Sequence, residues 1–414
     1  MDRKRKMDIY TESLKMHKKN VGKIDVVSTV KVENEHDLAL AYTPGVAQPC
    51  REIAKNPDML NTYTARGNMV AVVSDGSAVL GLGNIGAKAS LPVMEGKCVL
   101  FKEFGGVSAF PICIDSQDSD TIVNTVKLLE PSFAGINLED ISAPRCFEIE
   151  DRLKAETDML IFHDDQHGTA IVVLAGLMNA LKLSGRQMES IKVVINGAGA
   201  AGTAIAKLLR YVGAANIIVC DSKGIIYPGR EHLNPAKAEL AILTNPEKIK
   251  GALQDTARGS DVFIGVSVAD VLKPDMVAEM KKNPIIFAMA NPEPEIKPDI
   301  AKKCGVKIMA TGRSDYPNQV NNVLGFPAIF RGALDAKAKE INMEMKVASA
   351  RALASVVSNE LSEDCIIPKP FDRRVLPAVA VSIAKAAIET GVAPKDTDLG
   401  WIEKKAKSVF EDKK

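Results

Sequence analysis

The fold of this chain is decided by residues 191–202, Ile-Lys-Val-Val-Ile-Asn-Gly-Ala-Gly-Ala-Ala-Gly. Residues 191–196 are mostly β-branched and apolar, which predicts a buried strand. The glycines that follow have the pattern GxGxxG, and apolar residues then recur at helical spacing from Ile205 to Val212. A strand, a glycine turn and a helix in this order predict a dinucleotide site, with the pyrophosphate at the N-terminus of the helix.

An acidic residue at the end of the next predicted strand strengthens this interpretation. Asp221 stands 24 residues after Gly197, and a carboxylate at about 20 residues can accept hydrogen bonds from the adenosine ribose hydroxyls. Asp221 would repel a 2′-phosphate, which favours NAD, but three basic residues follow that could neutralise one, so NADP stays open. They are Lys223, Arg230 and Lys237. The predicted cofactor contacts are Gly197, Gly199, Ala200, Ala201, Gly202 and Asp221.

The rest of the chain alternates between predicted strands and helices, which indicates an α/β protein with parallel sheets. Before the glycine loop we expect strands at 69–74, 109–114, 135–138 and 159–162, and helices at 120–129 and 169–183. After it we expect strands at 216–220, 262–265, 285–289 and 306–310, and a helical region at 348–392. We predict two domains and a tail: a small N-terminal α/β domain with a parallel sheet (1–155), a Rossmann-like doubly wound NAD(P)-binding domain (156–390) and a C-terminal helical tail (391–414).

Composition excludes several classes of protein. The 414 residues are 46% hydrophobic and carry a net charge of +1, which argues against nucleic acid or a membrane surface as partner. The longest apolar run, 169–181, is shorter than the ~18 residues of a membrane span. The seven cysteines show no CxxC spacing, so neither a zinc knuckle nor a disulfide framework is indicated. Reduced thiols are typical of the cytoplasm, where we place the protein.

Three acidic residues follow predicted strands. Glu139 and Asp140 end one strand, and Asp165 lies just after another, within Phe-His-Asp-Asp-Gln-His-Gly-Thr-Ala at 162–170. The carboxyl ends of parallel strands meet at one edge of a sheet, so the three side chains could face one cleft. Carboxylates that converge repel one another unless a cation lies among them, and oxygen ligands suit Mg²⁺ or Mn²⁺. The alternative is an ordinary solvated acidic surface.

Two further motifs leave alternatives open. His163 and His167 are four residues apart, which suggests zinc, but the segment follows a strand and Gly168 comes next, so structural or supporting histidines are favoured. A second GxGxxG, residues 81–86, has no matching acid at a strand end. It is either a tight turn or a cradle of backbone amides near a substrate carboxylate.

Taken together, several segments resemble those of the malic enzyme family, in its short bacterial and archaeal branch. The resemblance extends from about residue 20 to residue 390. The segments are Ala-Tyr-Thr-Pro-Gly-Val-Ala at 41–47, the glycine loop at 81–86, Glu-Gly-Lys at 95–97, Leu-Glu-Asp-Ile at 138–141, His-Asp-Asp-Gln-His-Gly-Thr-Ala at 163–170, Ala-Asn-Pro at 290–292 and Val-Asn-Asn-Val at 320–323.

The resemblance implies oxidative decarboxylation of malate to pyruvate and CO₂, with reduction of NAD(P)⁺ and a divalent metal, Mg²⁺ or Mn²⁺. By this resemblance Tyr42 is the acid, Lys97 is the base, and Asp164 helps to set the charge of the lysine. We expect burial and the cation to lower the pKa of Lys97, because only the neutral amine accepts a proton. The implied metal ligands are Glu139, Asp140 and Asp165. The implied substrate and nicotinamide contacts are Asn291 and Asn322 for the substrate and Asn291 and Asn321 for the cofactor.

One departure concerns the substrate carboxylate. The long eukaryotic relatives have an arginine in the segment aligned with residues 75–78, and this chain has none there. The amides of the glycine loop at 81–86, or Asn291 and Asn322, are left to hold that carboxylate.

Two other functions remain open. A malolactic-type enzyme, which converts malate to lactate, would use the same motifs. A dinucleotide-sensing protein that has lost catalysis would lack an acid, base or ligand residue, and none of these is missing here. The resemblance also implies a homodimer or a higher homo-oligomer. We expect an N-terminal arm with Tyr10 and Leu14 to cross to the neighbouring subunit, where Tyr42 would complete the site of the partner.

Overall fold

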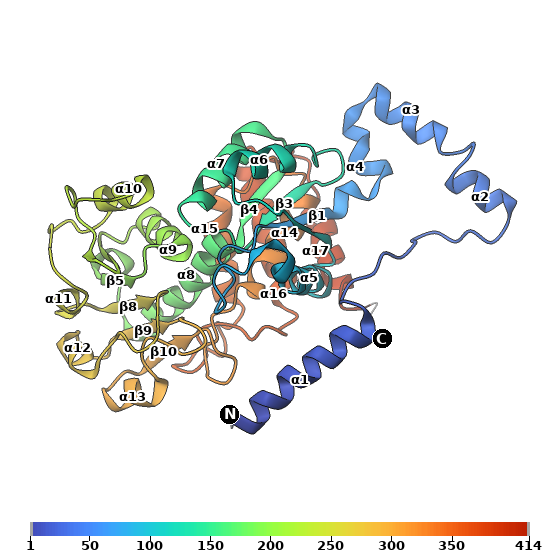
Figure 1. The fold of residues 1–414 in the computed structure, drawn as a ribbon. Coiled ribbons are helices and arrows are strands. Elements are labelled where there is room, and N and C mark those ends of the chain that lie inside the picture. The colour runs from blue at the N-terminus through green and yellow to red at the C-terminus, as the bar shows by residue number, and fades with distance from the viewer. Residues whose placement is uncertain (1–2, 412–414) are drawn as a thin grey trace.

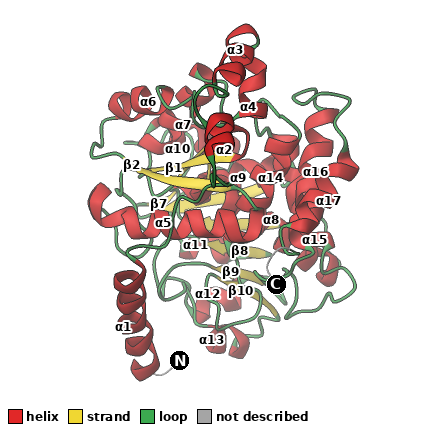
Figure 2. Cartoon of the chain, turned by 90° about the vertical axis from the view of Figure 1, so that its right-hand side faces the viewer, coloured by secondary structure: helices red, strands yellow, loops and turns green. Residues whose placement is uncertain are grey.

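The computed structural model describes residues 3–411 and contains two β-sheets with helices around them (Figures 1 and 2). The first sheet has parallel strands in the order β2-β1-β3-β4. Their bounds are β1 (Met69–Ser74), β2 (Ser108–Cys113), β3 (Gly135–Leu138) and β4 (Leu160–His163). The strand order changes direction between β1 and β3, and open α/β sheets bind ligands at the carboxyl ends of strands at such a point.

The second sheet is the predicted Rossmann-like sheet. Its strands have the order β10-β9-β8-β5-β6-β7, and all are parallel except β7, which pairs antiparallel with β6. Their bounds are β5 (Lys192–Asn196), β6 (Asn216–Asp221), β7 (Gly224–Ile225), β8 (Val262–Gly265), β9 (Ile285–Ala288) and β10 (Ile308–Thr311). The glycine loop follows β5, where the order changes direction between β5 and β8. The two-sheet α/β fold class is therefore confirmed.

One strand lies in a different sheet from the one we expected. Residues 159–162 were predicted to open the second sheet, but β4 pairs with β3 of the first sheet, from Gly135↔Leu160 to Leu138↔His163. The apolar pattern of a strand specifies a buried position and not its neighbour, so the sequence did not reveal this pairing. The pairing brings the residues after β3 and after β4 to the same edge of one sheet. The domain bounds 1–155, 156–390 and 391–414 remain predictions.

Helix α8 (Asp164–Ser184) begins five residues before the predicted start at 169. His163 occupies its N-cap position, and Asp164 and Asp165 lie in its first turn, where negative charge is stabilised by the helix dipole. By length and composition alone, one helix among the described residues, α8, could span a membrane. However, 67% of its apolar 18-residue stretch is buried inside the protein.

The C-terminal helices pack on one another and against α5 and α8. The predicted helical region 348–392 is interrupted by a loop, because α15 ends at Ser355 and α16 begins at Val375. Phe326 of α14 packs on Phe101 of α5, with ring centroids 4.7 Å apart. The helix bounds in this region are α14 (Phe326–Asp335), α15 (Met343–Ser355), α16 (Val375–Glu389) and α17 (Leu399–Ser408).

The largest of the four hydrophobic clusters among the described residues joins both sheets. It contains Val70 and Phe162 from the first sheet, Val193 and Ile195 from the second, and Phe330 from α14, each fully buried. The other helices of the two sheets are α5 (Gly86–Gly105), α6 (Ser119–Lys127), α7 (Arg145–Glu156), α9 (Ala200–Tyr211), α10 (Pro235–Leu243), α11 (Gln254–Ala257), α12 (Pro274–Glu279) and α13 (Pro298–Lys303). All seven cysteines lie in the described part of the chain as free thiols.

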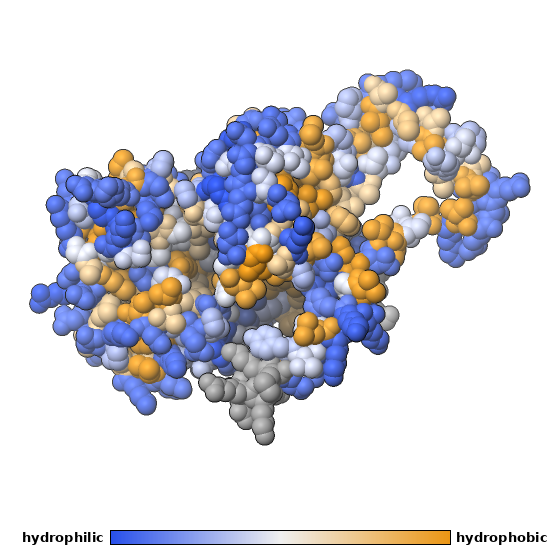
Figure 3. Space-filling model, viewed as in Figure 1, coloured by the Kyte–Doolittle hydropathy of each residue, from blue (hydrophilic) through white to orange (hydrophobic). Residues whose placement is uncertain are grey.

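The N-terminal arm, residues 3–63, has a different character. It comprises α1 (Arg3–Asn20), α2 (Glu35–Ala41), α3 (Ala47–Lys55) and α4 (Leu60–Tyr63), and α2 and α3 extend away from the rest of the molecule (Figure 1). Hydrophobic residues lie on its outer surface (Figure 3). The exposed fractions of Leu38, Leu40 and Tyr42 are 51%, 63% and 68%.

Candidate active site

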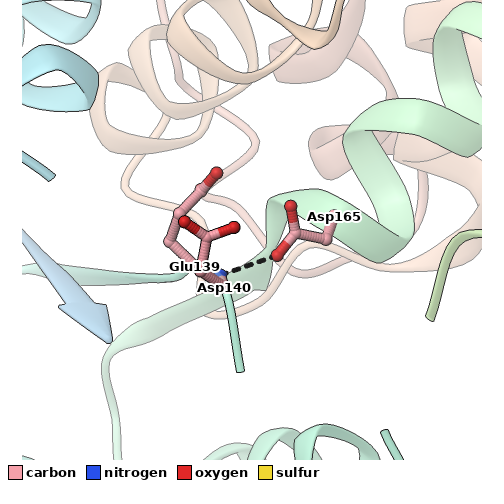
Figure 4. A group of neighbouring side chains, drawn as sticks. All are labelled: Glu139, Asp140 and Asp165. Atoms are coloured by element: carbon pink, nitrogen blue, oxygen red, sulfur yellow. Dashed lines mark hydrogen bonds between the residues drawn. The ribbon is translucent and has the colours of Figure 1, made fainter. Parts of the chain in front are cut away.

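The three predicted metal ligands meet at the edge of the first sheet. Glu139 and Asp140 follow β3, and Asp165 comes from the first turn of α8, directly after β4 (Figure 4). Potential ligand atoms of the three lie within 4.8 Å of one another. The backbone N–H of Asp140 donates to Oδ2 of Asp165 at 2.8 Å, which fixes the two segments against each other. We call these three side chains the acidic cluster.

The electrostatics of the acidic cluster suit a bound cation. Burial and the neighbouring charges of Asp165 and Glu139 raise the pKa of Asp140 to about 9. Burial also raises the pKa of Asp165 to about 6. Among the described residues Oδ2 of Asp140 is buried without a hydrogen-bond partner. An oxygen-only donor set with unmatched negative charge fits Mg²⁺ or Mn²⁺.

Lys97 lies beside the acidic cluster on α5. Its Nζ is 2.6 Å from Oδ2 of Asp164 and 2.8 Å from Oε1 of Glu139, and it lies 4.3 Å from the ring centroid of Phe326. Burial favours the neutral amine, but the charges of Asp164, Glu139 and Asp165 outweigh it and raise the pKa of Lys97. Without a cation, three carboxylates therefore hold the ammonium form, and the lowering expected with the cation bound stays a prediction.

Gly168 is required by the packing of the same turn. A Cβ atom at this position would lie 1.8 Å from Oδ1 of Asp164 and 3.3 Å from Cβ of Asn322. Any larger residue would displace the carboxylate that bonds to Lys97.

The loop after β1 touches the acidic cluster from the other side. The N–H of Ala78 donates to the carbonyl oxygen of Asp140 at 2.9 Å, and the N–H of Leu80 bonds to its carboxylate. The glycine loop at 81–86 follows directly. The N–H groups of Leu82, Gly83, Ile85 and Gly86 bond to the carbonyl oxygens of Val79 and Gly76, so the amides of Gly81 and Asn84 are the candidates for the substrate-cradle alternative.

An arginine from elsewhere in the chain contacts residues 75–78, the segment that contains no arginine of its own. Nη2 of Arg145, on α7, donates to Oδ2 of Asp75 at 2.8 Å and to Oγ of Ser77 at 3.0 Å. This guanidinium is engaged by the protein itself, so it holds the 75–78 segment in place.

The predicted cofactor loop lines a large cavity. The cavity has a volume of about 1240 Å³ and is bordered by Gly197, Gly199 and Asp221 among others. Ala200 and Ala201 open α9, and a Cβ at Gly202 would lie 1.8 Å from the carbonyl oxygen of Gly197. The turn therefore excludes a side chain at Gly202, as close packing of the helix on the preceding strand and turn requires.

Asp221 has no unoccupied carboxylate oxygen. Oδ1 accepts from the backbone N–H of Lys223 at 2.9 Å and from Nη1 of Arg230 at 3.0 Å. Oδ2 accepts from Nη2 of Arg230 at 2.5 Å and from Nζ of Lys237 at 2.7 Å. Burial alone would raise the pKa of Asp221, but these hydrogen bonds lower it. The acid expected to bind ribose is thus paired with two cations.

The predicted asparagines occupy two places. Asn322 lies against Asp164: burial raises the pKa of this acid to about 7, and Lys97 and Asn322 partly oppose that shift. Asn321 caps a short 3₁₀ helix at 322–324 by accepting from the N–H of Val323 at 3.0 Å. Asn291 follows β9, and its Nδ2 lies 3.4 Å from the carbonyl oxygen of Met289. The structure brings only Asn322 against the Lys97–Asp164 pair.

Tyr42 is the one predicted catalytic residue that lies apart from these groups. It stands at the C-terminus of α2 on the projecting N-terminal arm (Figure 1). Its backbone N–H bonds to the carbonyl oxygen of Leu38, and its side chain is 68% exposed.

Several buried groups were missed in the sequence. Glu295 is fully buried and accepts from the N–H groups of Ser267 and Ala290, each at 3.0 Å, so it ties together the loops after β8 and β9. Glu150 of α7 accepts from Nε2 of His167 at 2.7 Å. Nothing in the local sequence distinguishes these glutamates from solvated ones. Within residues 3–411 neither His163 nor His167 belongs to a cluster of three metal-binding side chains, so the zinc alternative has no structural support.

Comparison with known proteins adds independent evidence. The family model described as "Malic enzyme, N-terminal domain" matches residues 21–154, and "Malic enzyme, NAD binding domain" matches residues 166–388. A Bacillus subtilis protein named "Bifunctional malic/malolactic enzyme" is 59% identical, with 97% of this chain and 99% of that protein covered. The "NAD-dependent malic enzyme" of Geobacillus stearothermophilus is 56% identical over 91% of this chain and 78% of its own length.

A solved structure agrees with these matches. The crystal structure of a malic enzyme from Pyrococcus horikoshii superposes with a TM-score of 0.94 at 47% identity, and covers 97% of this chain and 96% of that one. These matches therefore agree with the resemblance seen in the motifs. The chain belongs to the malic enzyme family.

Proposed function

We propose that this protein catalyses the oxidative decarboxylation of malate to pyruvate and CO₂ with reduction of NAD(P)⁺. The observation that carries the proposal is the buried Lys97, which contacts Asp164 and Glu139 next to the acidic cluster. Named relatives include both NAD-dependent and NADP-dependent malic enzymes. A dinucleotide-sensing protein without catalysis would have no need of this arrangement.

The acidic cluster, Glu139, Asp140 and Asp165, would hold the divalent cation. A cation held there would supply Lewis acidity for negative charge that develops on the C2 oxygen of malate. Lys97 accepts the proton of the C2 hydroxyl as hydride leaves C2 for the nicotinamide. Glu139 is at once a partner of the Lys97 ammonium and a member of the acidic cluster, so its use as a ligand weakens its hold on the lysine proton.

Tyr42 delivers a proton to C3 of the enolate as general acid. Its exposure on the N-terminal arm supports an action on a second copy of the chain, so that each site takes its tyrosine from the partner of a homodimer. Exposed apolar side chains on the arm, such as Leu38 and Leu40, support the same assembly, because contiguous apolar surface marks protein interfaces.

The substrate carboxylate distant from Lys97 is held by Asn322 and by the backbone amides of Gly81 and Asn84, which the glycine loop at 81–86 does not use for its own hydrogen bonds. The contacts of Ala78 and Leu80 with Asp140 support this arrangement, because they place the loop next to the acidic cluster. The amide of Gly199 and the N-terminus of α9 receive the pyrophosphate, since the N–H of Gly197 already bonds to the carbonyl oxygen of Cys220. Asn291 and Asn321 lie on the loops proposed to face the nicotinamide ribose.

Arg230 and Lys237 make NADP an acceptable cofactor. Both cations lie on Asp221, so the carboxylate that would repel a 2′-phosphate is already neutralised. NAD remains a cofactor as well, because the ribose hydroxyls can bond to the same polar groups.

A malolactic activity is the second candidate, and the name of the Bacillus subtilis relative favours it. Purified protein is incubated with malate, Mn²⁺ and either NAD or NADP, while reduced nucleotide, pyruvate and lactate are measured. Reduced nucleotide formed together with pyruvate supports the proposed function. Lactate formed without free reduced nucleotide would replace it by the malolactic reaction.

A further inference from the structure

A group of buried charged side chains lies behind the acidic cluster and takes no part in the proposed reaction. It joins three helices: Glu150 comes from α7, His167 from α8 and Lys346 from α15. Glu150 is 3% exposed and Lys346 is 6% exposed. The three side chains line a cavity of about 100 Å³. Burial of charged groups is costly unless they are hydrogen-bonded, so the arrangement calls for a role.

The hydrogen bonds of this group have a defined direction, from Lys346 to His167 and from His167 to Glu150. Nε2 of His167 lies 2.7 Å from Oε1 of Glu150, and Nδ1 of His167 lies 3.1 Å from Nζ of Lys346. The carboxylate can only accept, so Nε2 carries the hydrogen. Lys346 can donate to Nδ1 only if that nitrogen carries no proton. The two partners therefore fix one tautomer and one orientation of the imidazole.

Glu150 also holds the residue before the histidine. Nε2 of Gln166 donates to its second carboxylate oxygen at 2.8 Å. Gln166 and His167 directly follow Asp164 and Asp165 in the first turn of α8. Two successive residues of this turn are thus bonded to α7, and the second is also bonded to α15.

The first turn of α8 needs such support. It carries the fully buried carboxylate of Asp164 and the partly exposed carboxylate of Asp165, whose Oδ2 accepts from the backbone N–H of Asp140 at 2.8 Å. A side chain that must stay close to other negative groups is displaced unless the backbone is held. In metal sites, removal of a group that orients a ligand typically lowers metal affinity by about 10–100-fold.

We propose that Lys346, acting through His167 and Glu150, is a positioning residue that holds the first turn of α8 in the geometry that binds the metal. The proposal rests on the metal site of the proposed function. It assigns no contact with substrate or cofactor to Lys346.

The test measures Mn²⁺ binding to the full chain by electron paramagnetic resonance of the free ion. Lys346→Met keeps the length of the side chain and removes the donor, and we expect Mn²⁺ affinity to fall about tenfold. Lys405→Met is the matched control, because Lys405 is also partly buried and bonds to Asp335, in contact with α14 instead of α8. Unchanged Mn²⁺ affinity in Lys346→Met would overturn the proposal.

A double-mutant cycle separates positioning from general destabilisation. If Lys346 acts through the imidazole, Lys346→Met has no further effect on Mn²⁺ affinity in a His167→Phe protein. Additive losses in the double variant contradict the proposal. Should Lys346→Met fail to fold, His167→Phe alone decides: it must also weaken Mn²⁺ binding, and unchanged affinity overturns the network.

The proposed metal site itself is tested separately with Asp140→Asn. If Asp140→Asn leaves Mn²⁺ affinity unchanged, Asp140 is not a ligand and the proposed function fails at that point. If Asp140→Asn abolishes binding while Lys346→Met does not weaken it, only the positioning role is lost.

Discussion

The acidic cluster and the N-terminal arm are opposite in character. Glu139, Asp140 and Lys97 are nearly buried, and each is fixed by contacts from several elements. Tyr42 lies on helices that project into solvent, and its side chain is 68% exposed. A single chain therefore holds the metal-binding and proton-accepting groups in place but leaves its proposed acid without a surrounding site.

The difference indicates that the acidic cluster and the N-terminal arm have separate roles in the proposed reaction. Buried charges need a rigid frame, because their energy depends steeply on distance in a medium of low polarity. A projecting arm with exposed apolar residues gains its fixed position only by packing on another surface. We expect changes in the acidic cluster and at Lys97 to act within each chain. Changes in the N-terminal arm should act on the partner.

The largest effect is expected from Lys97→Ala. Removal of the proposed base should lower kcat for malate oxidation by about 10³-fold while nucleotide binding persists, because Lys97 does not line the nucleotide cavity. Turnover with malate and nucleotide binding by fluorescence titration are the measurements. Lys88→Ala, an exposed lysine on the same helix, is the control. Near-normal turnover of Lys97→Ala would remove Lys97 from the reaction.

Tyr42→Phe comes next. It should slow malate turnover by about 10²-fold through loss of the proton donor, whereas decarboxylation of added oxaloacetate continues. Tyr63→Phe, also on the arm, is the control, since Tyr63 is 49% exposed and has no proposed role. Pyruvate tautomerisation is followed by hydrogen exchange at C3. An unchanged exchange rate in Tyr42→Phe clears this residue of the role.

Cofactor preference should respond to the cations on Asp221. The double variant Arg230→Ala/Lys237→Ala exposes the carboxylate, so kcat/KM for NADP should fall about tenfold relative to that for NAD. Steady-state rates with each nucleotide give this ratio. The exposed Arg258→Ala serves as control. An unaltered ratio in the double variant would show that residues other than Arg230 and Lys237 recognise the 2′-phosphate.

The smallest expected effect concerns stability without metal. The pKa of Asp140 is raised from its ordinary value of 3.8 to about 9, so the folded state binds more protons than the unfolded state between these values. Stability of the metal-free protein should therefore decrease as pH rises from about 4 to 9. Thermal unfolding in EDTA should show a lower Tm at pH 9 than at pH 6, and Mn²⁺ should restore it.

Asp140→Asn is the matched variant for that experiment. It should flatten the decrease of Tm with pH and abolish the stabilisation by Mn²⁺. A Tm that rises with pH in the metal-free protein, or a decrease as steep in Asp140→Asn as in the native chain, would contradict the assignment of the raised pKa.

Much of the fold follows from local sequence. β1 and β3 were predicted with the bounds that the structure has, because buried parallel strands are short apolar runs between turns. The placement of β4 was not predictable, because pairing partners are set by contacts between distant segments. The early start of α8 was missed because charged and histidine residues precede its apolar part.

The candidate site was likewise predictable from the sequence only in part. The motifs identified Lys97, Asp164 and the acidic cluster, and the structure brings them together. The raised pKa of Lys97 was not predictable, because it depends on the number of carboxylates that surround the amine in three dimensions. Lys346 and Glu150 gave no signal, since a single charged residue in a helix is usually solvated.

The most direct test of the division between core and arm is a mixed dimer of Tyr42→Phe and Lys97→Ala chains. Each variant alone is nearly inactive. If the tyrosine acts on the partner, a mixed dimer contains one site with both groups intact, and an equal mixture of the two variants should regain about one active site in four. Activity no greater than the sum of the separate variants would contradict the account and place both groups in a site formed by one chain.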